Sequence, residues 1–186
     1  MPPKVKVTKE DIVRAAIGII RNSGDQALNA GTVAAALNCS TQPIFSNFAT
    51  MEELRFAVVA AADTMCREYM KQEAESGRYP LYKASGMAYI RFAKEEKELF
   101  KLLYMRDRKS EPIPEDDDLN SEMTTLVHQN TGLDPQKAKL FHLEMWAYVH
   151  GIATMFATGF FDLDWDLVSQ MLTDSYQGLR KQHITE

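Results

Sequence analysis

The chain lacks an excess of positive charge. Its 186 residues carry 21 lysines and arginines against 26 aspartates and glutamates, a formal net charge of −5. Proteins that bind any nucleic acid through bulk electrostatics are usually basic, so this balance argues against a general polyanion binder. It leaves open a local basic surface on one face of the protein.

Cysteine and long apolar runs are also scarce. The only cysteines are Cys39 and Cys66, and the first seven residues have no apolar core like that of a signal peptide. Two such thiols indicate reduced side chains and not a disulfide. The longest uninterrupted apolar run covers residues 56–62, whereas a membrane-spanning helix needs about 20 apolar residues. We therefore expect a soluble, cytoplasmic protein without a membrane partner.

The sequence shows no motif of a known catalytic or cofactor site. It has no glycine-rich phosphate loop and no nucleophile elbow. The adjacent acids Glu52 and Glu53 point apart on a helix. His142 and His150 would lie about 80° apart around a helix, which is poor geometry for one metal ion. The sequence predicts a protein that is not an enzyme, with no cofactor and no metal site.

Helical spacing of apolar residues dominates the chain, and alternating strand patterns and solenoid repeats are missing. We predict an all-α fold of about nine helices. Eight of them are expected over residues 8–23, 29–38, 40–48, 51–76, 81–94, 95–107, 135–159 and 165–181. A further helix follows the acidic run 115–118 and ends near residue 131. The segment 106–118 is expected to be a loop.

The first 54 residues predict a helix-turn-helix module of three helices. Thr8, Asn29 and Ser40 are suitable N-caps, and Asn38 can adopt the positive φ that the turn requires. A module this small usually holds one helix against the major groove of DNA. Three apolar residues are expected to anchor the third helix inward: Ile44, Phe45 and Phe48.

The chain resembles the TetR family of bacterial transcriptional regulators. The resemblance rests on Ile12-Val13-x-Ala15-Ala16 before Gly24, Val33-Ala34 before Ser40, Ile44-Phe45-x-x-Phe48 before Glu52-x-Leu54, and Trp146-x-x-x-His150-Gly151. It implies a homodimer with a DNA-binding domain over residues 1–52 and a helical ligand-binding and dimerisation domain over residues 53–186. It further implies repression from a palindromic operator in double-stranded DNA, released by a small-molecule effector.

The sequence departs from the family pattern where DNA contacts are expected. Phe45 stands where tyrosine is common, Met51 where lysine is common, and Gly31 where a polar or basic residue is frequent. Losing a lysine phosphate contact removes about 0.9 from the salt slope of binding in each subunit. We therefore expect binding that depends on neutral donors. The alternative is a helical interaction adaptor, derived from such a regulator, with weakened DNA binding.

Gln42 and Asn47 are the best candidates for reading base edges, because an amide can pair bidentately with adenine. Lys4 and Lys6 form a short basic arm that could reach a flanking groove. The complete set of predicted DNA-binding residues is Lys4, Lys6, Thr32, Thr41, Gln42, Pro43, Phe45, Ser46 and Asn47.

The last two helices carry wide apolar stripes and small residues that permit close approach. The pattern alone fits both an intramolecular core and a four-helix dimer interface, and the resemblance favours the dimer. The predicted interface residues are Gly151, Met155, Leu167, Val168, Met171, Leu172, Ser175 and Leu179.

Methionines and aromatic residues of the second half are candidates for lining an apolar pocket. A pocket of this kind would favour an apolar or aromatic ligand. His150 is expected either to contact that ligand or to pack on Trp146 and bond a carbonyl. The predicted ligand-binding residues are Met87, Phe92, Phe100, Leu103, Tyr104, Met145, Trp146 and His150.

Overall fold

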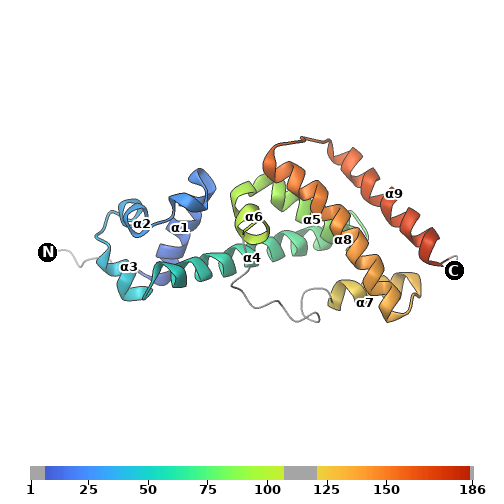
Figure 1. Ribbon diagram of the computed structural model, residues 1–186, viewed down its shortest axis with the longest axis horizontal. Helices are drawn as coiled ribbons and strands as arrows, with labels where there is room; N and C mark the ends of the chain where they lie inside the picture. The colour runs from blue at the N-terminus through green and yellow to red at the C-terminus, as the bar shows by residue number, and fades with distance from the viewer. Residues whose placement is uncertain (1–6, 107–120, 185–186) are drawn as a thin grey trace. The chain divides into compact units, whose positions relative to one another are not determined.

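The computed structural model describes residues 7–106 and 121–184, which form nine α-helices, one 3-10 helix and no strand (Figure 1). This confirms the predicted all-α fold. The elements are α1 (Lys9–Ser23), η1 (Asp25–Ala27), α2 (Ala30–Ala36), α3 (Gln42–Asn47), α4 (Met51–Glu75), α5 (Leu81–Glu95), α6 (Lys97–Tyr104), α7 (Ser121–Thr131), α8 (Pro135–Thr158) and α9 (Trp165–Ile184).

Local capping explains where several helices begin. The Thr8 hydroxyl accepts a hydrogen bond from the Asp11 backbone N–H, and the Asp11 carboxylate accepts one from the Thr8 N–H in return. Asn29 and Thr32 make the same reciprocal pair at α2. Each pair satisfies two backbone donors that the first helical turn leaves without partners. Asn38 has a φ of 50°, as the predicted turn requires.

Other local predictions were wrong. The N-cap of α3 is Thr41 and not Ser40, and its side chain makes no capping hydrogen bond. Phe45 is exposed, so it is not an inward anchor of α3. The sixth helix is shorter than residues 95–107, since Glu96 and Met105 are its caps. α9 continues past residue 181 to Ile184. The predicted loop 106–118 lies almost entirely outside the described residues.

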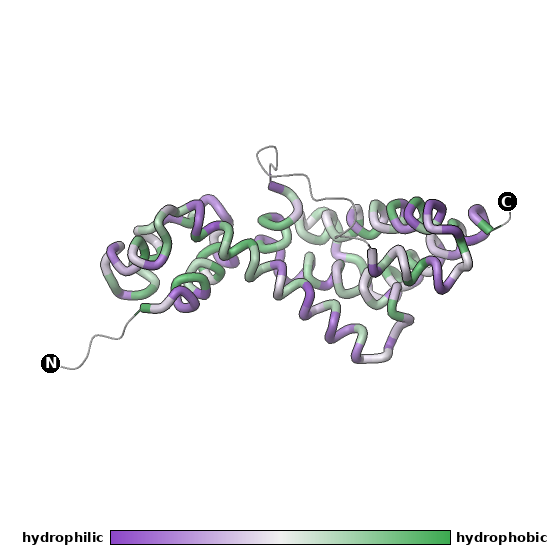
Figure 2. Tube along the Cα trace, turned by 90° about the horizontal axis from the view of Figure 1, so that it is seen from below, coloured by the Kyte–Doolittle hydropathy of each residue, from purple (hydrophilic) through white to green (hydrophobic). Residues whose placement is uncertain are grey.

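The described residues form two compact units. The first contains residues 7–67 and 96–106, and the second contains residues 68–95 and 121–184. α4 contributes to both units. Figure 2 shows its hydrophobic residues gathered over 56–62 and mostly hydrophilic residues from 67 onward. The first unit extends beyond residue 52. The boundary at residue 52 between a DNA-binding domain and a ligand-binding domain remains a prediction.

Within the first unit, α6 packs against α1 although the two are far apart in sequence. Arg21 donates from Nε and Nη2 to the two carboxylate oxygens of Glu96, at 2.7 and 2.6 Å. Such a bidentate pair fixes orientation as well as distance. Arg55 of α4 forms an ion pair with Asp25 of η1 through Nη1, and its Nη2 donates to the backbone carbonyls of Asp25 and Leu28. These contacts hold α1, η1, α4 and α6 together as one unit.

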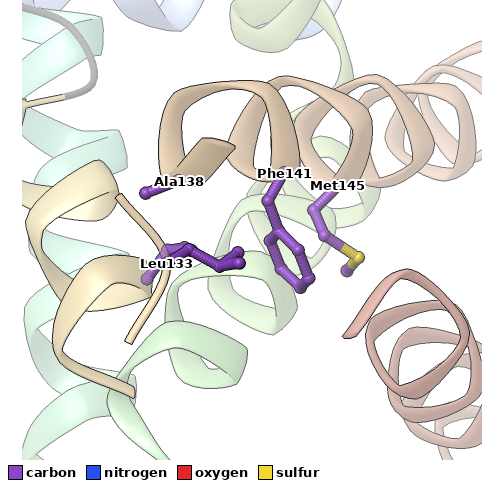
Figure 3. Packing of buried hydrophobic residues seen from close by; sticks show 5 residues of the cluster. Leu133, Ala138, Phe141 and Met145 are labelled. Carbon is purple, nitrogen blue, oxygen red and sulfur yellow. The ribbon is translucent and has the colours of Figure 1, made fainter. Parts of the chain in front are cut away.

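Within the second unit, α8 packs against α5, α7 and α9. Its first half contributes to a buried cluster, in which Leu133 and Phe141 point toward one another with Met145 beside the ring (Figure 3). Val127 of α7 and Ala138 complete this cluster, with Tyr176 and Leu179 of α9 packed against it. The inner face of α8 is therefore the centre of this unit.

Two tyrosine–histidine pairs also link α5 to α8. The Tyr82 hydroxyl lies 2.9 Å from Nδ1 of His142, and the Tyr89 hydroxyl lies 2.9 Å from Nδ1 of His150. Burial lowers the pKa of both histidines and raises the pKa of Tyr82. The phenol of Tyr82 therefore donates to a neutral imidazole. The two pairs ascend both helices together, so α5 and α8 run in the same direction where they touch.

Truncation of Phe141 to alanine should lower the free energy of unfolding by about 3–5 kcal/mol, because it leaves a cavity in the core of the second unit. Leu81 of α5, in the same unit, is 55% exposed, whereas Phe141 is 0% exposed. Leu81→Ala is therefore the control and should change stability little. Urea unfolding followed by circular dichroism measures both variants, and similar losses in the two would contradict this assignment of the core.

The buried His142 predicts a stability that falls with acid. The pKa of His142 is lowered by burial in the folded protein, whereas a histidine in an unfolded chain has a pKa of about 6.5. Below that pH the unfolded chain binds a proton that the folded chain does not bind, so the free energy of unfolding decreases as the pH falls. Urea titrations at about pH 7.5 and 5.5 should show a smaller decrease in His142→Gln than in the wild type. Equal decreases in the two proteins would exclude His142 as the cause.

Candidate functional site

The third helix presents a polar and aromatic surface to solvent. Ile44 and Phe48 are 1% and 3% exposed and fix α3 to the first unit, whereas Phe45 is 48% exposed. Thr41, Gln42 and Ser46 are also exposed, and Pro43 is half-buried. The exposed positions fall at helical spacing on one side of α3. This side is the candidate surface for DNA.

Asn47 does not face outward as the sequence analysis expected. It is half-buried, and its amide nitrogen donates to the Pro43 carbonyl at 2.8 Å and to the Val7 carbonyl at 3.4 Å. A bidentate contact with adenine needs both the donor and the acceptor of an amide. In this conformation Gln42 is the better candidate for such a contact, and Asn47 instead fixes the chain at Val7 to α3.

Two of the predicted hydroxyl donors are also engaged within the protein. The Ser46 hydroxyl donates to the Gln42 carbonyl at 2.9 Å. The Thr32 hydroxyl lies 2.9 Å from the Ala27 carbonyl and takes part in the cap of α2. Short polar side chains on helices often bond the backbone one turn earlier in this way. Thr41 and Gln42 are the predicted hydroxyl and amide donors whose side chains are exposed without a hydrogen bond among the described residues.

The basic side chains of α1 lie near carboxylates. Arg14 is 3.3 Å from Asp11, Lys9 is 3.9 Å from Glu53, and Arg21 is paired with Glu96. These pairs reduce the positive potential that α1 adds to the surface of the first unit. Lys4 and Lys6, the predicted basic arm, lie outside the described residues.

An open groove of about 830 Å³ lies between α1 and α4. Its lining includes the apolar residues Val13, Ile17, Ala57 and Met65 and charged residues such as Arg14. None of the predicted ligand-binding residues lines it. This groove could not be predicted from the sequence, because it depends on how two helices far apart in sequence pack together.

The predicted ligand-binding residues are divided between the two units. Three of them belong to α6 in the first unit, namely Phe100, Leu103 and Tyr104, and the other five belong to the second. The Tyr104 hydroxyl lies 3.6 Å from Sγ of Cys66, and burial raises the pKa of that thiol to about 11. Cys66 is therefore a protonated core residue and not a reactive thiol.

In the second unit Met87, Phe92 and Met145 are buried, whereas Trp146 is exposed. His150 stacks on Trp146 with ring centroids 5.2 Å apart. Packing on Trp146 was one of the two predicted roles of His150. The Tyr89 hydroxyl lies 2.9 Å from Nδ1 of the same His150 ring. Tyr82 and Tyr89 were missed by the sequence analysis. Their spacing of seven nearly matches the spacing of eight between the two histidines, which is the signal that could have found them.

The predicted dimer residues have different surroundings. Val168 and Leu172 are core residues within the protomer, so their side chains do not reach the surface, and the sequence pattern was misleading there. Leu179 packs against the cluster around Phe141. Met155 and Leu167 are exposed, and the remaining three are half-buried: Gly151, Met171 and Ser175. The exposed face of α8 also includes Leu140 and Leu143, which the prediction omitted.

Among the described residues, no group of three or more histidine, cysteine, aspartate or glutamate side chains could hold a metal ion. Within 7–106 and 121–184, no helix has the length and apolar character needed to cross a membrane.

Comparison with known proteins identifies the family. Residues 82–175, which include most of α5 and α9 and everything described between them, match the family model for the C-terminal domain of tetracycline repressor-like proteins. A TetR-like transcriptional regulator from Rhodococcus sp. RHA1 has a similar fold, with a TM-score of 0.69 at 15% identity over 96% of this chain and 98% of its own.

A putative TetR family transcriptional regulator from Vibrio parahaemolyticus has a TM-score of 0.62 at 19% identity, over 90% of this chain and 96% of its own. A search of curated proteins finds no significant match. At these identities the solved structures support the fold, and the family model supports the relationship. The chain belongs to the TetR family of transcriptional regulators.

Proposed function

We propose that the protein binds a palindromic operator in double-stranded DNA as a homodimer, represses transcription there, and is released by a small apolar or aromatic ligand. The observation that carries this proposal is the exposed surface of α3. Its two anchors, Ile44 and Phe48, are buried, while Gln42 and Phe45 remain available to a partner.

The chemistry of α3 supports sequence-specific contacts that depend little on charge. Gln42 can donate to and accept from an adenine edge, and Phe45 can pack against a thymine methyl group. Thr41 can donate to a phosphate oxygen. The cations of α1 are paired within the protein, so the contribution of counterion release should be modest.

Two glycines support a second copy of the chain on the outer faces of α8 and α9. Gly151 and Gly178 lie inside these helices, and a Cβ added to either would meet nothing within 4 Å. A glycine inside a helix costs about 1 kcal/mol relative to alanine. Close packing within the protomer explains Gly86, because a Cβ there would lie 3.1 Å from Leu172. A closely packed helix of a second subunit would explain Gly151 and Gly178 in the same way.

The apolar character of the second unit supports the proposed class of effector. Met87 and Phe92 of α5 and Met145 of α8 contribute thioether and aromatic surface to its interior. Methionine adapts to ligands of varied shape, and the tyrosine–histidine pairs supply a small number of polar groups. An uncharged apolar or aromatic molecule fits these surroundings best.

Selection from random DNA duplexes tests operator binding, and we expect an enriched palindrome. On that site Met51→Lys should steepen the salt slope by about 0.9 per subunit, because it adds one phosphate contact at the start of α4. Thr125→Lys adds the same charge on an exposed position of α7 and should leave the slope unchanged. Failure to enrich any site would favour the interaction adaptor instead.

Replacing Gly151 with leucine tests the dimer. The new side chain has open space within the protomer, so the fold should persist, whereas a close helix of a second subunit would clash with it. We expect sedimentation velocity to show a shift from dimer to monomer. Gln177→Leu, at an exposed position of α9, adds similar apolar bulk and should leave the dimer intact. A dimer that tolerates Gly151→Leu would place the interface elsewhere.

A further inference from the structure

Lys83 of α5 is held by neutral groups. Its ammonium nitrogen lies 2.7 Å from the Ser169 hydroxyl and 2.8 Å from the Thr173 hydroxyl, both on α9. It also lies 4.9 Å from the centre of the Tyr79 ring. All four residues are half-buried, so the amine is partly shielded yet reachable from solvent.

Lys94 and Lys101, by contrast, are held by carboxylates. Lys94 is 2.6 Å from Asp162, and Lys101 is 2.7 Å from Glu98. A carboxylate favours the charged ammonium and makes it a poor nucleophile. No ion pair among the described residues involves Lys83, so it lacks this stabilisation of its charge.

The two hydroxyls that hold Lys83 suit the neutral amine, whereas the Tyr79 ring favours the charged ammonium. A neutral amine retains two N–H donors, which is the number that Ser169 and Thr173 require, and leaves its lone pair for reaction. The Thr173 hydroxyl donates to the Ser169 carbonyl at 2.9 Å, so its oxygen is oriented to accept from the amine. Burial also lowers the pKa of Lys83. Lys83 thus combines a geometry that tolerates the loss of a proton with access to solvent.

We propose that Lys83 is a site of covalent acylation by small acyl phosphates. In this reaction the lone pair of Nζ attacks the carbonyl carbon of the acyl phosphate. A C–N bond forms, the bond between that carbon and the phosphate oxygen breaks, and phosphate leaves with the electron pair. Nζ releases one proton to solvent, and the product is a neutral amide.

Acylation would alter the contact between α5 and α9. The amide nitrogen has one N–H donor, which cannot serve both Ser169 and Thr173, and the charge above Tyr79 is lost. The contact has little room nearby, since a Cβ at Gly86 would already approach Leu172 to 3.1 Å. The acylated side chain therefore turns to solvent and leaves α9 less firmly held at this point.

Incubation of the whole protein with acetyl phosphate, followed by peptide mass spectrometry, tests the site. Lys94 is the internal control, because it is also half-buried but is paired with Asp162. We expect Lys83 to be acetylated faster than Lys94 and to reach its limiting rate at a lower pH. Lys83→Arg should lose the modified peptide while acetylation of Lys94 continues. Acetylation of Lys94 at the same rate as Lys83 or faster, or no acetylation of Lys83, would overturn the proposal.

Hydrogen exchange tests the structural consequence. Lys83→Gln, which imitates the neutral acylated side chain, should increase amide exchange in the first turns of α9 around Ser169, and Lys83→Arg should increase it less. Equal exchange in the two variants would overturn this consequence. Neither measurement involves DNA, so a failure here is distinguishable from a failure of the proposed operator binding.

Discussion

The inner face of α8 is the constraint on which the second unit depends. This face is buried from Ala138 to Ala157, and three other helices pack against it. The tyrosine–histidine pairs join α5 to α8. Val168 and Leu172 of α9 are core residues, and α9 packs against α8. Burial on this scale dominates the stability of a helical domain, whereas the individual hydrogen bonds select one register of the helices.

The sequence was sufficient where structure is decided locally. The caps Thr8 and Asn29 mark helix starts through contacts within a few residues, and α1, α2 and α8 begin where expected, although α2 ends at Ala36 and not at residue 38. It was insufficient at α3, where six residues give too little periodicity to decide which apolar side chains face inward. Phe45 was misassigned for that reason. Ser40 was misassigned because the chain adopts helical geometry one residue later, at Thr41.

Prediction of side-chain partners between helices reached its limit for another reason. From sequence alone, the positions of Val168 and Leu172 in α9 fit a dimer interface and an intramolecular core equally well. Only the packing of α9 against its neighbouring helices shows that both side chains are buried within the protomer. Tyr89 and His150 are 61 residues apart in sequence, and their pairing follows from the relative rotation of α5 and α8. Asn47 likewise has a polar side chain at a position suited to outward projection, yet its amide bonds the backbone of the segment before α1. Which residues contact DNA remains a prediction. Thr41, Gln42 and Phe45 are the best candidates, because their side chains are exposed and are not engaged with the backbone as those of Ser46 and Asn47 are.

The bidentate pair between Arg21 and Glu96 has a consequence for how the chain is made. It makes the first unit discontinuous, since α6 must return to α1 after residues 68–95 have been added. At a synthesis rate of about 5–20 residues per second, that insertion takes roughly one to six seconds. During this interval the Arg21–Glu96 pair and the packing of α1 against α6 cannot yet form. The helices α1 to α3 are therefore synthesised well before α6, which completes the first unit.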